Sequence, residues 1–489
     1  MNLQELLAIL PYYKTNKAIE DISVTGIEND HRNITSGNMF VCIKGYTVDG
    51  HDLAEAAIEN GARVIVAEKP LEVENAIVIT VPDTTRALAL LAGKYYDFPS
   101  SKFSLVGITG TNGKTTTTYL LEKIFQEHKK KTALIGTIQM KIGEEAFPMK
   151  NTTPDALALQ KAFHEMKEAD VEAAFMEVSS HALDLGRSYG TDFDVALFTN
   201  LSQDHLDYHK DMADYLRAKT LLFTGLGNGY GDKKKFAVIN TDDEVSNSII
   251  KSTSQHILTY GLKHSADVMA KDIKYALTDT RFTLETPYDS TTIKSHLIGT
   301  FNVYNMLAAA TVALALDVPL ATIKQALESI TGVDGRFEQV VAGQDYAVIV
   351  DYAHTSDSLE NVLQTIDNFK ENKVYVVVGA GGDRDKTKRP LMAAVAEKYS
   401  DYVFLTSDNP RTEDPKEILA DMEKGMVGES YEVIESRKAA IESAVALANA
   451  GDVILIAGKG HETYQEINGV RHDFDDRAIA KEAIKNSEV

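Results

Sequence analysis

Short apolar runs alternate with helix-like stretches along almost the whole chain, and this alternation predicts an α/β fold. In the first part of the chain, apolar runs at 39–43, 62–67 and 76–81 are separated by helix-like segments at 52–60 and 84–96. They predict a small N-terminal α/β domain. The segment Asp97-Phe-Pro-Ser-Ser101 interrupts both patterns and predicts a linker.

Two further series of apolar runs predict two larger domains. Runs rich in β-formers at 103–108, 133–138, 173–178, 195–200 and 236–240 alternate with helical stretches, which is typical of a doubly wound, mostly parallel sheet. After a turn region at 332–335, runs at 347–350, 374–378, 402–406 and 453–457 repeat the pattern. We therefore expect three α/β domains: residues 1–98, a central domain at 99–332 and a Rossmann-like C-terminal domain at 333–489.

Polar or glycine-rich residues follow each strand-like run of the C-terminal series, at 351–354, 379–385, 407–411 and 458–462. In open α/β sheets, ligands bind at the carboxyl ends of the strands. We therefore expect these four segments to line one rim of the C-terminal sheet.

Composition narrows the classes of function. The 489 residues include 50 Lys plus Arg against 72 Asp plus Glu, and the net charge of −22 argues against binding to nucleic acid or to an anionic membrane. Cys42 is the only cysteine, so no internal disulfide can form, and its apolar neighbours predict a buried thiol. The sequence has no signal-peptide pattern and no long apolar stretch, so we expect a cytoplasmic protein with no membrane insertion.

The segment GITGTNGKT at 107–115 lies between a strand-like and a helix-like run, where a phosphate-binding loop belongs. Gly110 and Gly113 allow tight turns that direct backbone N–H groups and the positive end of the next helix toward an anion. Lys114 offers a positive charge to the β- and γ-phosphates, and Thr115 offers a hydroxyl to Mg²⁺. The loop is contracted, because isoleucine replaces the first glycine of the common pattern. A plain turn is the alternative, but the flanking strand and helix favour nucleotide binding.

Two strand ends carry candidate metal ligands. Glu177 ends the run 173–178 and is suited to a Mg²⁺ ion held by Thr115. His205 follows the run 195–200 and can ligate a second cation. A lone histidine at a strand end is more often a surface or capping residue, but its expected place beside Glu177 and the phosphate loop favours metal binding.

Asn302 and Asn305 lie at the start of an alanine-rich helix and share one face of it. Amides in this position cap the helix or contact the edge of a base. Capping is the more common role.

Six segments resemble the Mur ligases, a family of ATP-dependent enzymes that form amide bonds. In the order of that family they are GTNGKTT at 110–116, EVSSH at 177–181, NLSQDH at 200–205, GTFNVYN at 299–305, GRFE at 335–338 and DYAH at 351–354. The resemblance covers most of the chain. It implies an N-terminal UDP-binding domain, a central ATP-binding domain and a C-terminal domain that brings the amino acid.

The resemblance also implies a role for individual residues. ATP would bind to Gly110, Thr111, Asn112, Gly113, Lys114, Thr115, Thr116, Asn302 and Asn305. Two Mg²⁺ ions would be held by Thr115, Glu177, His205 and Lys219, with Lys219 carbamylated, and Lys114 would complete the catalytic set. An unmodified Lys219 would instead be an ordinary solvated charge. The UDP-N-acetylmuramoyl dipeptide would contact Asp30, His31, Arg32, Thr152, Thr153, Ser179 and Arg187, where His31 replaces the serine that is usual in the family.

The amino-acid substrate is implied by the motif Asp408, Asn409, Pro410 and Arg411, which resembles that of Mur ligases adding meso-diaminopimelate. In those relatives the arginine pairs with the distal carboxylate, which lysine lacks. Arg384, Gly458 and Glu462 would complete the pocket, with Glu462 holding the distal ammonium.

The implied function is ATP-dependent addition of meso-diaminopimelate to the D-glutamyl γ-carboxylate of UDP-N-acetylmuramoyl-L-Ala-D-Glu, in the synthesis of peptidoglycan precursors. We expect a monomer. The alternatives are an L-lysine-adding variant, a ligase similar to folylpolyglutamate synthase, and a scaffold that binds nucleotide without turnover.

Overall fold

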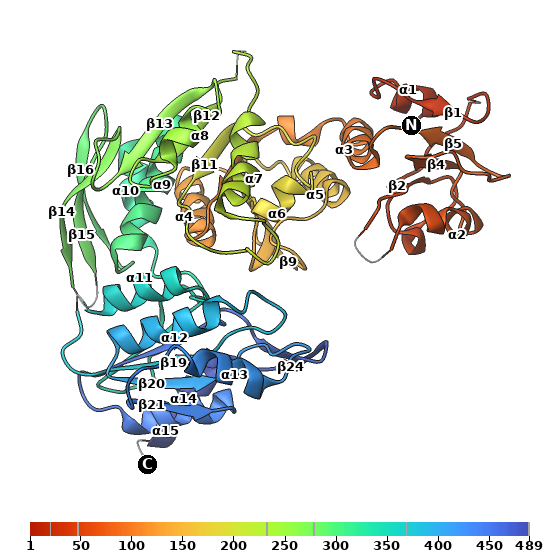
Figure 1. Cartoon of the computed structure of the whole chain (residues 1–489). Helices are drawn as coiled ribbons and strands as arrows, with labels where there is room; N and C mark the ends of the chain where they lie inside the picture. Colours follow the sequence, from red (N-terminus) through yellow and green to blue (C-terminus); the bar gives the residue numbers. More distant parts are fainter. Residues whose placement is uncertain (20, 46–47, 231–232, 277–278, 368, 488–489) are drawn as a thin grey trace.

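The structure, a computed structural model, describes residues 1–489 except 20, 46–47, 231–232, 277–278, 368 and 488–489. Its strands form three large sheets and a small hairpin, one after another along the chain. In Figure 1 the N-terminal part (red) projects from one side of the central part, and the C-terminal part (blue) lies below it. The predicted three-domain α/β fold is thus confirmed, while the domain limits at 98/99 and 332/333 stay a prediction.

The N-terminal sheet has the strand order β1-β5-β4-β3-β2, in which only β1 is antiparallel. Helices α1 and α3 pack on one face and α2 on the other. Cys42 is buried, as predicted. The elements are α1 (Leu3–Leu7), β1 (Lys14–Thr15), β2 (Ile27–Glu28), η1 (His31–Asn33), β3 (Met39–Val41), η2 (Gly50–Leu53), α2 (Ala54–Glu59), β4 (Val64–Ala67), β5 (Ile77–Thr80), α3 (Thr84–Tyr95) and η3 (Pro99–Ser101).

The central sheet has eleven strands in the order β16-β15-β14-β13-β12-β11-β6-β10-β7-β8-β9, and its core from β14 to β7 is parallel. Helices α4, α9 and α10 cover one face, and α5, α7 and α8 cover the other. Strand β6 (Ser104–Thr109) is buried on both sides, which explains its continuous apolar run.

The remaining central elements are α4 (Lys114–Glu127), β7 (Thr132–Ile135), β8 (Gln139–Ile142), β9 (Glu145–Pro148), α5 (Ala156–Glu168), β10 (Ala173–Glu177), α6 (Ser180–Asp184), β11 (Val195–Phe198), α7 (Met212–Thr224), β12 (Phe236–Asn240), α8 (Ser246–Ile250), β13 (His256–Gly261), β14 (Val268–Tyr275), β15 (Thr280–Glu285), β16 (Ser290–Ser295), α9 (Thr300–Ala315) and α10 (Leu320–Ser329).

Both edges of the central sheet carry antiparallel strands that the sequence pattern did not predict. Strands β8 and β9 extend one edge, and β15 and β16 extend the other. The strand predicted at 133–138 extends too far toward the C-terminus, because β7 ends at Ile135 and the chain then turns into β8.

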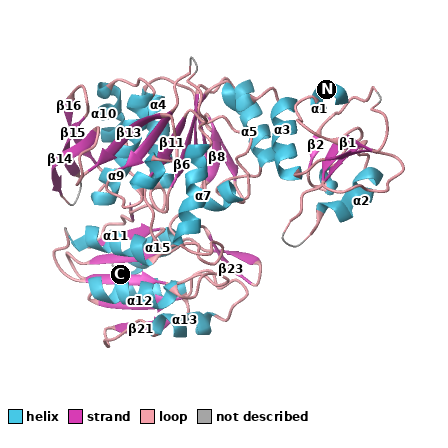
Figure 2. Cartoon of the chain, turned by 45° about the horizontal axis from the view of Figure 1, so that its top comes forward, coloured by secondary structure: helices cyan, strands magenta, loops and turns pink. Residues whose placement is uncertain are grey.

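The C-terminal sheet has the order β17-β18-β22-β19-β20-β21, with β17 antiparallel. Helices α11, α12 and α13 pack on one face and α14 and α15 on the other. Figure 2 shows these layers of helix and strand beside those of the central domain. The elements are β17 (Glu338–Gln339), β18 (Ala347–Asp351), α11 (Ser356–Asp367), β19 (Val374–Val378), α12 (Lys388–Tyr399), β20 (Tyr402–Thr406), α13 (Pro415–Glu423), β21 (Tyr431–Ile434), α14 (Arg437–Leu447), β22 (Val453–Ala457), β23 (Tyr464–Ile467), β24 (Val470–Asp473) and α15 (Asp476–Ser487).

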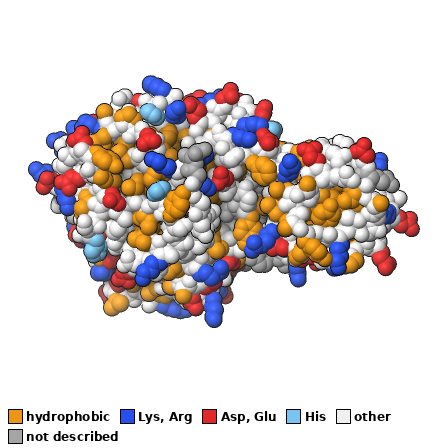
Figure 3. Space-filling model, turned by 90° about the horizontal axis from the view of Figure 1, so that it is seen from above, with side chains coloured by type: hydrophobic (Ala, Val, Ile, Leu, Met, Phe, Trp, Pro, Cys, Tyr) orange, Lys and Arg blue, Asp and Glu red, His pale blue; other side chains and the backbone are white. Residues whose placement is uncertain are grey.

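The surface carries side chains of both charges and apolar side chains, as the composition of the chain leads one to expect. On the face in Figure 3, acidic and basic side chains are interspersed with apolar ones. In the described part of the chain, every helix is too short or too polar to cross a membrane.

Candidate active site

A cavity of about 1130 Å³ lies between the central and C-terminal domains. Its central wall contains residues of the phosphate loop. Its C-terminal wall contains residues from each of the four strand-end segments that were expected to share one rim, 351–354, 379–385, 407–411 and 458–462. Predicted site residues on the cavity are Thr111, Asn112, Gly113, Lys114, Thr115, Thr116, Thr152, Glu177, Ser179, Arg187, His205, Lys219, Asn305, Arg384, Asp408, Asn409, Arg411, Gly458 and Glu462. Residues predicted from separate motifs therefore share one chamber.

The phosphate loop is held by the segment that follows β11. The Thr111 N–H donates to the Asn200 carbonyl over 2.8 Å, and the Asn112 N–H donates to the Asn200 side chain over 2.9 Å. Gly113 has a φ of 86°, and a side chain there would collide with the Asn305 amide oxygen. Only glycine therefore allows the loop to pass so close to α9.

Lys114 begins α4 and folds back over the loop. Its Nζ donates to the carbonyls of Gly110 and Thr111 over 2.9 and 2.7 Å. Burial lowers the pKa of Lys114 below its usual value. This position places the amine among the loop atoms that a phosphate group would approach.

Glu177 ends β10 and is 1% exposed. Its carboxylate accepts hydrogen bonds from the Thr137 N–H and hydroxyl over 2.9 and 3.0 Å. The Thr115 hydroxyl accepts a bond from Arg336 Nη2 over 3.0 Å. Both groups therefore have fixed positions on the cavity wall.

His205 adopts a left-handed backbone conformation with a φ of 56°. Non-glycine residues in this region are often found at functional sites. Burial lowers the pKa of the imidazole, although Asp204 lies 3.4 Å away and opposes the shift. A neutral imidazole is the form that ligates a cation.

The donor set fits a Mg²⁺ ion that is shared with phosphate oxygens and water. Hydroxyl and carboxylate oxygens are the ligands that Mg²⁺ prefers, and it retains several waters in protein sites. Among the described residues, no three His, Cys, Asp or Glu side chains gather closely enough to hold a metal ion alone. The oxygens of Thr115 and Glu177 would supply part of such a coordination shell.

Lys219 lies on α7 with only 1% of its surface exposed. Its Nζ donates to the Gly110 carbonyl over 2.7 Å and lies 4.3 Å from the centroid of the Tyr215 ring. Burial and the nearby charge of Lys114 hold the pKa of Lys219 well below its usual value. The alternative of an ordinary solvated lysine is therefore wrong.

Four predicted site residues lie just behind the cavity wall. Thr153 is fully buried, donates to the Glu177 carbonyl and accepts from the Ser179 N–H, so it supports the wall. Asn302 donates to the Ile298 carbonyl, which precedes its helix, and receives a bond from Asn305. Neither amide caps α9, whose N-cap is Gly299. Gly110 and Pro410 complete this group, outside the lining residues described.

The N-terminal triplet Asp30, His31 and Arg32 lies in another domain, outside the described lining of this cavity. Asp30 caps the short helix η1 and pairs with Arg32 over 2.6 Å, and this hydrogen bonding holds the pKa of the Asp30 carboxyl well below its usual value. In the neighbouring loop 45–50, residues 46–47 lie outside the described residues.

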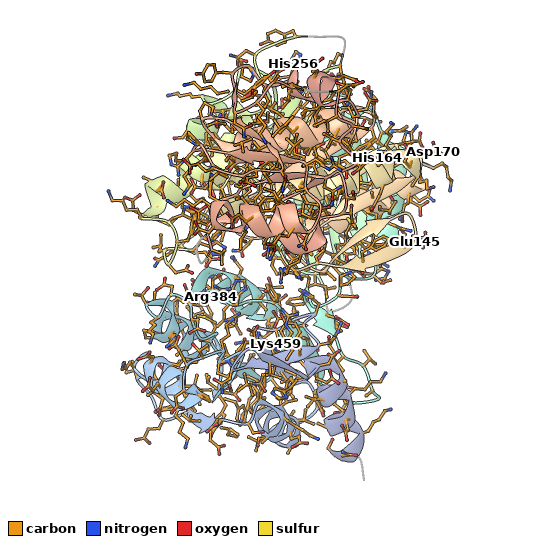
Figure 4. The ribbon with its side chains drawn as sticks, turned by 90° about the vertical axis from the view of Figure 1, so that its right-hand side faces the viewer. Glu145, His164, Asp170, His256, Arg384 and Lys459 are labelled. Carbon is orange, nitrogen blue, oxygen red and sulfur yellow. The ribbon has the colours of Figure 1, made fainter. Side chains whose placement is uncertain are left out.

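The Arg411 guanidinium lies against the C-terminal strand ends. Its Nη1 donates to the Gly382 carbonyl over 2.7 Å, and its backbone has a φ of 51°. Asp408 and Glu462 lie on the same wall, so charges of both signs face the cavity. Arg384 lies on the side of the C-terminal domain that faces the central domain (Figure 4).

Three stretches of the chain match family models. They are described as the Mur ligase family catalytic domain at 23–96, the Mur ligase middle domain at 108–313 and the Mur ligase glutamate ligase domain at 335–460. The UDP-N-acetylmuramoyl-L-alanyl-D-glutamate–2,6-diaminopimelate ligase of Oceanobacillus iheyensis is 59% identical over 99% of each chain. The Bacillus cereus protein of that name is 55% identical over 95% of each chain. The chain belongs to the Mur ligase family.

Solved structures extend the comparison. The match to one solved structure has a TM-score of 0.72 at 35% identity and covers all of both chains; that structure is of a UDP-N-acetylmuramoyl-L-alanyl-D-glutamate–2,6-diaminopimelate ligase. Mycobacterium tuberculosis folylpolyglutamate synthase shares the fold with a TM-score of 0.62 at 17% identity, over 76% of this Mur ligase and 92% of the synthase.

Several cavity residues of this Mur ligase were given no role from the sequence. Arg336 and Asp351 belong to segments that carried the resemblance, and burial raises the pKa of Asp351 to about 6. Their sequence motifs were a usable signal. Asp357 and Lys388 carried no such signal, because they reach the cavity only through packing of the two domains.

Proposed function

We propose that this Mur ligase joins meso-diaminopimelate to the γ-carboxylate of D-glutamate in UDP-N-acetylmuramoyl-L-Ala-D-Glu, with conversion of ATP to ADP and phosphate. The observation that carries the proposal is the shared cavity, in which the phosphate loop and the wall formed by Arg411, Arg384 and Glu462 lie in different domains. One chamber can therefore activate a carboxylate and present it to an amino acid.

The γ-carboxylate must be activated before an amide bond can form, because a carboxylate at neutral pH is a poor electrophile. A carboxylate oxygen takes the γ-phosphoryl group of ATP, which releases ADP and leaves an acyl phosphate. The amine nitrogen then attacks the acyl carbon, and the tetrahedral intermediate collapses as the bond to the phosphate oxygen breaks. The products are an amide, phosphate and the proton lost from nitrogen.

The phosphate loop would position the nucleotide through its N–H groups and Lys114. Thr115, Glu177, His205 and carbamylated Lys219 would hold two Mg²⁺ ions, which supply charge neutralisation between phosphate and carboxylate oxygens. Asn305 lies beside the loop on the cavity wall, where it would contact the adenine, and it donates a hydrogen bond to the Asn302 side chain.

The muramoyl substrate would extend from the cavity toward the N-terminal domain. Thr152, Ser179 and Arg187 lie on the central wall of the cavity, where they can meet the peptide or phosphate end. Asp30, His31 and Arg32 are the proposed uridine contacts. Thr153 would act by holding Ser179 rather than by touching the substrate.

Selectivity for meso-diaminopimelate would come from two opposite charges. Arg411 can pair with the distal carboxylate through its planar fork, and Glu462 can accept the distal ammonium. L-Lysine has no distal carboxylate and would leave Arg411 unpaired while presenting a like charge to it.

A parallel assay tests the proposal. ATP and UDP-N-acetylmuramoyl-L-Ala-D-Glu are offered with meso-diaminopimelate, L-lysine or L-ornithine, and phosphate release and product mass are measured. We expect turnover with meso-diaminopimelate and little with the other two amino acids. Preference for L-lysine would reject the assigned specificity, and nucleotide binding without turnover would support the scaffold alternative.

Arg411→Ala sharpens this test. The KM for meso-diaminopimelate should rise about tenfold or more, since a charged hydrogen-bonding partner is lost, while the KM for ATP stays close to that of the wild type. Arg63→Ala, at an exposed position of the N-terminal domain, is the matched control. An unchanged KM for the amino acid would remove Arg411 from the pocket.

A ligase similar to folylpolyglutamate synthase is the remaining alternative. The likeness to the solved synthase concerns the fold alone and leaves about a quarter of this chain uncovered. Replacing the muramoyl dipeptide with a folate in the same assay separates the two activities, and we expect no phosphate release with folate.

A further inference from the structure

The hairpin β23–β24 is hydrogen bonded to the loop that carries Arg411. The Arg411 N–H donates to the Glu466 carbonyl over 3.0 Å, and the Asn468 N–H donates to the Arg411 carbonyl over 2.7 Å. Gln465 Nε2 donates to the Asp408 carbonyl over 2.6 Å. The hairpin therefore fixes the backbone on both sides of this arginine.

This backbone pairing has a specific consequence for Arg411. A φ of 51° lies in the left-handed region, which non-glycine residues adopt only when their surroundings enforce it. Both backbone polar groups of Arg411 are bonded to the hairpin. The strained conformation directs the guanidinium toward Gly382 and the cavity, so the hairpin pre-organises the side chain.

Lys459 makes the corresponding connection at Glu462. Its side chain is fully buried, outside the described lining of the cavity, and Figure 4 places it within the C-terminal domain. Its Nζ donates to Glu462 Oε2 and to Asn409 Oδ1, each over 3.0 Å. Asn409 Nδ2 closes the triangle with a 2.8 Å bond to Glu462 Oε2. One carboxylate oxygen is thus held, and its orientation is fixed.

Asn409 joins the two connections. Its amide oxygen accepts both the Lys459 amine and the Glu466 N–H, the latter over 2.9 Å. The residue that holds Glu462 is therefore bonded to the strand that holds Arg411. A displacement of either part would be transmitted to the other through Asn409.

We propose that Lys459 and the β23–β24 hairpin are the positioning elements of the amino-acid pocket, Lys459 for Glu462 and the hairpin for Arg411. This inference rests on the proposed function, because it assigns these elements to recognition of the distal centre of meso-diaminopimelate. They act through the two recognition residues and do not touch the substrate. Their rigid connection keeps the two opposite charges at the spacing that the distal ammonium and carboxylate require.

The electrostatic setting supports a role for Lys459. Burial raises the pKa of the Glu462 carboxyl, and the Lys459 charge opposes that shift. Among the described residues, the other charged or titratable groups that interact with Glu462 include Asp408, Tyr352, Arg437 and Tyr464. Without Lys459, the Glu462 pKa rises further, so the carboxyl becomes protonated as the pH falls and no longer holds an ammonium.

The first test is Lys459→Met. We expect the KM for meso-diaminopimelate to rise about tenfold or more, with kcat and the KM for ATP within about twofold of wild type. The rise should be larger at low pH and smaller at high pH. A double variant with Glu462→Gln should be no worse than Glu462→Gln alone, because Lys459 acts through that carboxylate. The control is Lys438→Met, because Lys438 is an exposed lysine on α14.

The second test addresses the hairpin and needs no buried charge to be removed. Asn468 and Gly469 form its turn with φ values of 49° and 76°, and a side chain at Gly469 would meet nothing within 4 Å. Gly469→Val therefore strains the turn without a collision. Gly227→Val is matched, since Gly227 has a φ of 78° and is equally uncrowded.

For Gly469→Val we expect a KM for meso-diaminopimelate at least about threefold higher and a smaller preference for it over L-lysine. A purely structural role would lower the active fraction and kcat without changing one KM selectively. If the wild type turns over meso-diaminopimelate but Lys459→Met and Gly469→Val both leave the KM values unchanged, the positioning inference is overturned while the proposed function stands. Absence of such turnover in the wild type would instead reject the proposed function.

Discussion

Lys219 is a buried lysine whose amine donates to the Gly110 carbonyl. Burial and Lys114 hold the pKa of Lys219 well below its usual value, which favours the neutral amine, the form that adds to carbon dioxide, over that of an exposed lysine. We predict that Lys219 is carbamylated. In ¹³C-bicarbonate, NMR should show a carbamate signal that Lys219→Ala abolishes, together with a loss of activity of about 100-fold or more.

Lys210→Ala, at an exposed site before α7, should retain both the signal and the activity. Short carboxylates such as acetate should restore part of the activity of Lys219→Ala, because they can replace the missing carboxylate. A wild-type enzyme that shows full activity in bicarbonate-free buffer without the signal would contradict the prediction.

At the residue scale, sequence motifs indicated which segments form the cavity more reliably than they indicated which side chains point into it. Thr152 and Thr153 are adjacent in one motif, yet Thr152 lines the cavity while Thr153 is buried behind it. Asn302 and Asn305 differ in the same way. Residue type and order cannot determine which neighbour points inward, because that depends on how the element packs.

At the element scale, the phosphate loop depends on its approach to α9. Gly113→Ala should weaken ATP binding strongly, because the new side chain would displace Asn305 and the loop. The left-handed φ alone costs about 1 kcal/mol of stability on substitution. Calorimetric titration with ATP measures the binding, and thermal unfolding measures the stability.

Gly227→Ala separates these two effects. Gly227 has a similar φ of 78° but nothing within 4 Å of the added carbon. The Gly227→Ala protein should therefore lose about as much stability as backbone strain alone costs in Gly113→Ala. Its affinity for ATP should remain that of the wild type. Equal ATP affinities for the two variants would show that crowding against Asn305 is unimportant.

The elements that the sequence predicted and those that it missed differ in burial. Strands such as β6, β10 and β19 are buried on both faces and appear as continuous apolar runs. Strands β9 and β24 are almost wholly exposed and carry mixed polar residues, so no apolar run marks them. Their pairing depends on neighbouring strands, which local sequence does not encode.

Helices α14 and α15 are joined by an ion pair between Arg437 and Asp476, whose side chains are both fully buried. Arg437→Met would leave the Asp476 carboxylate without its partner and should destabilise the C-terminal domain by about 3–5 kcal/mol. Hydrogen exchange of amides in the two helices measures the change. The double variant Arg437→Met/Asp476→Leu should recover most of the loss, and a double variant no more stable than the single would contradict this account.

At the scale of the whole molecule, the central and C-terminal domains both line the cavity, and no local sequence pattern indicated which side chains join them. Asp357 lies in the first turn of α11 in the C-terminal domain. Its Oδ2 accepts bonds from Asn112 Nδ2 over 2.8 Å and from Ser202 Oγ over 2.9 Å. Lys388 lies 3.6 Å from Asp204 across the same cavity. The phosphate loop is therefore bonded directly to the C-terminal domain, which we propose binds the amino acid.

This connection predicts that nucleotide binding and domain closure are coupled through Asp357. Asp357→Ala should raise the KM for ATP several-fold, about threefold to tenfold, because Asn112 loses its partner. Spin labels at Lys130 and Glu429, both exposed, should report a larger population of long interdomain distances in the variant. Glu371→Ala, an exposed acid of the same domain, should change neither quantity. If Asp357→Ala raised the KM while the distance distribution stayed that of the wild type, Asp357 would serve the loop alone, and closure would depend on other contacts such as that of Lys388.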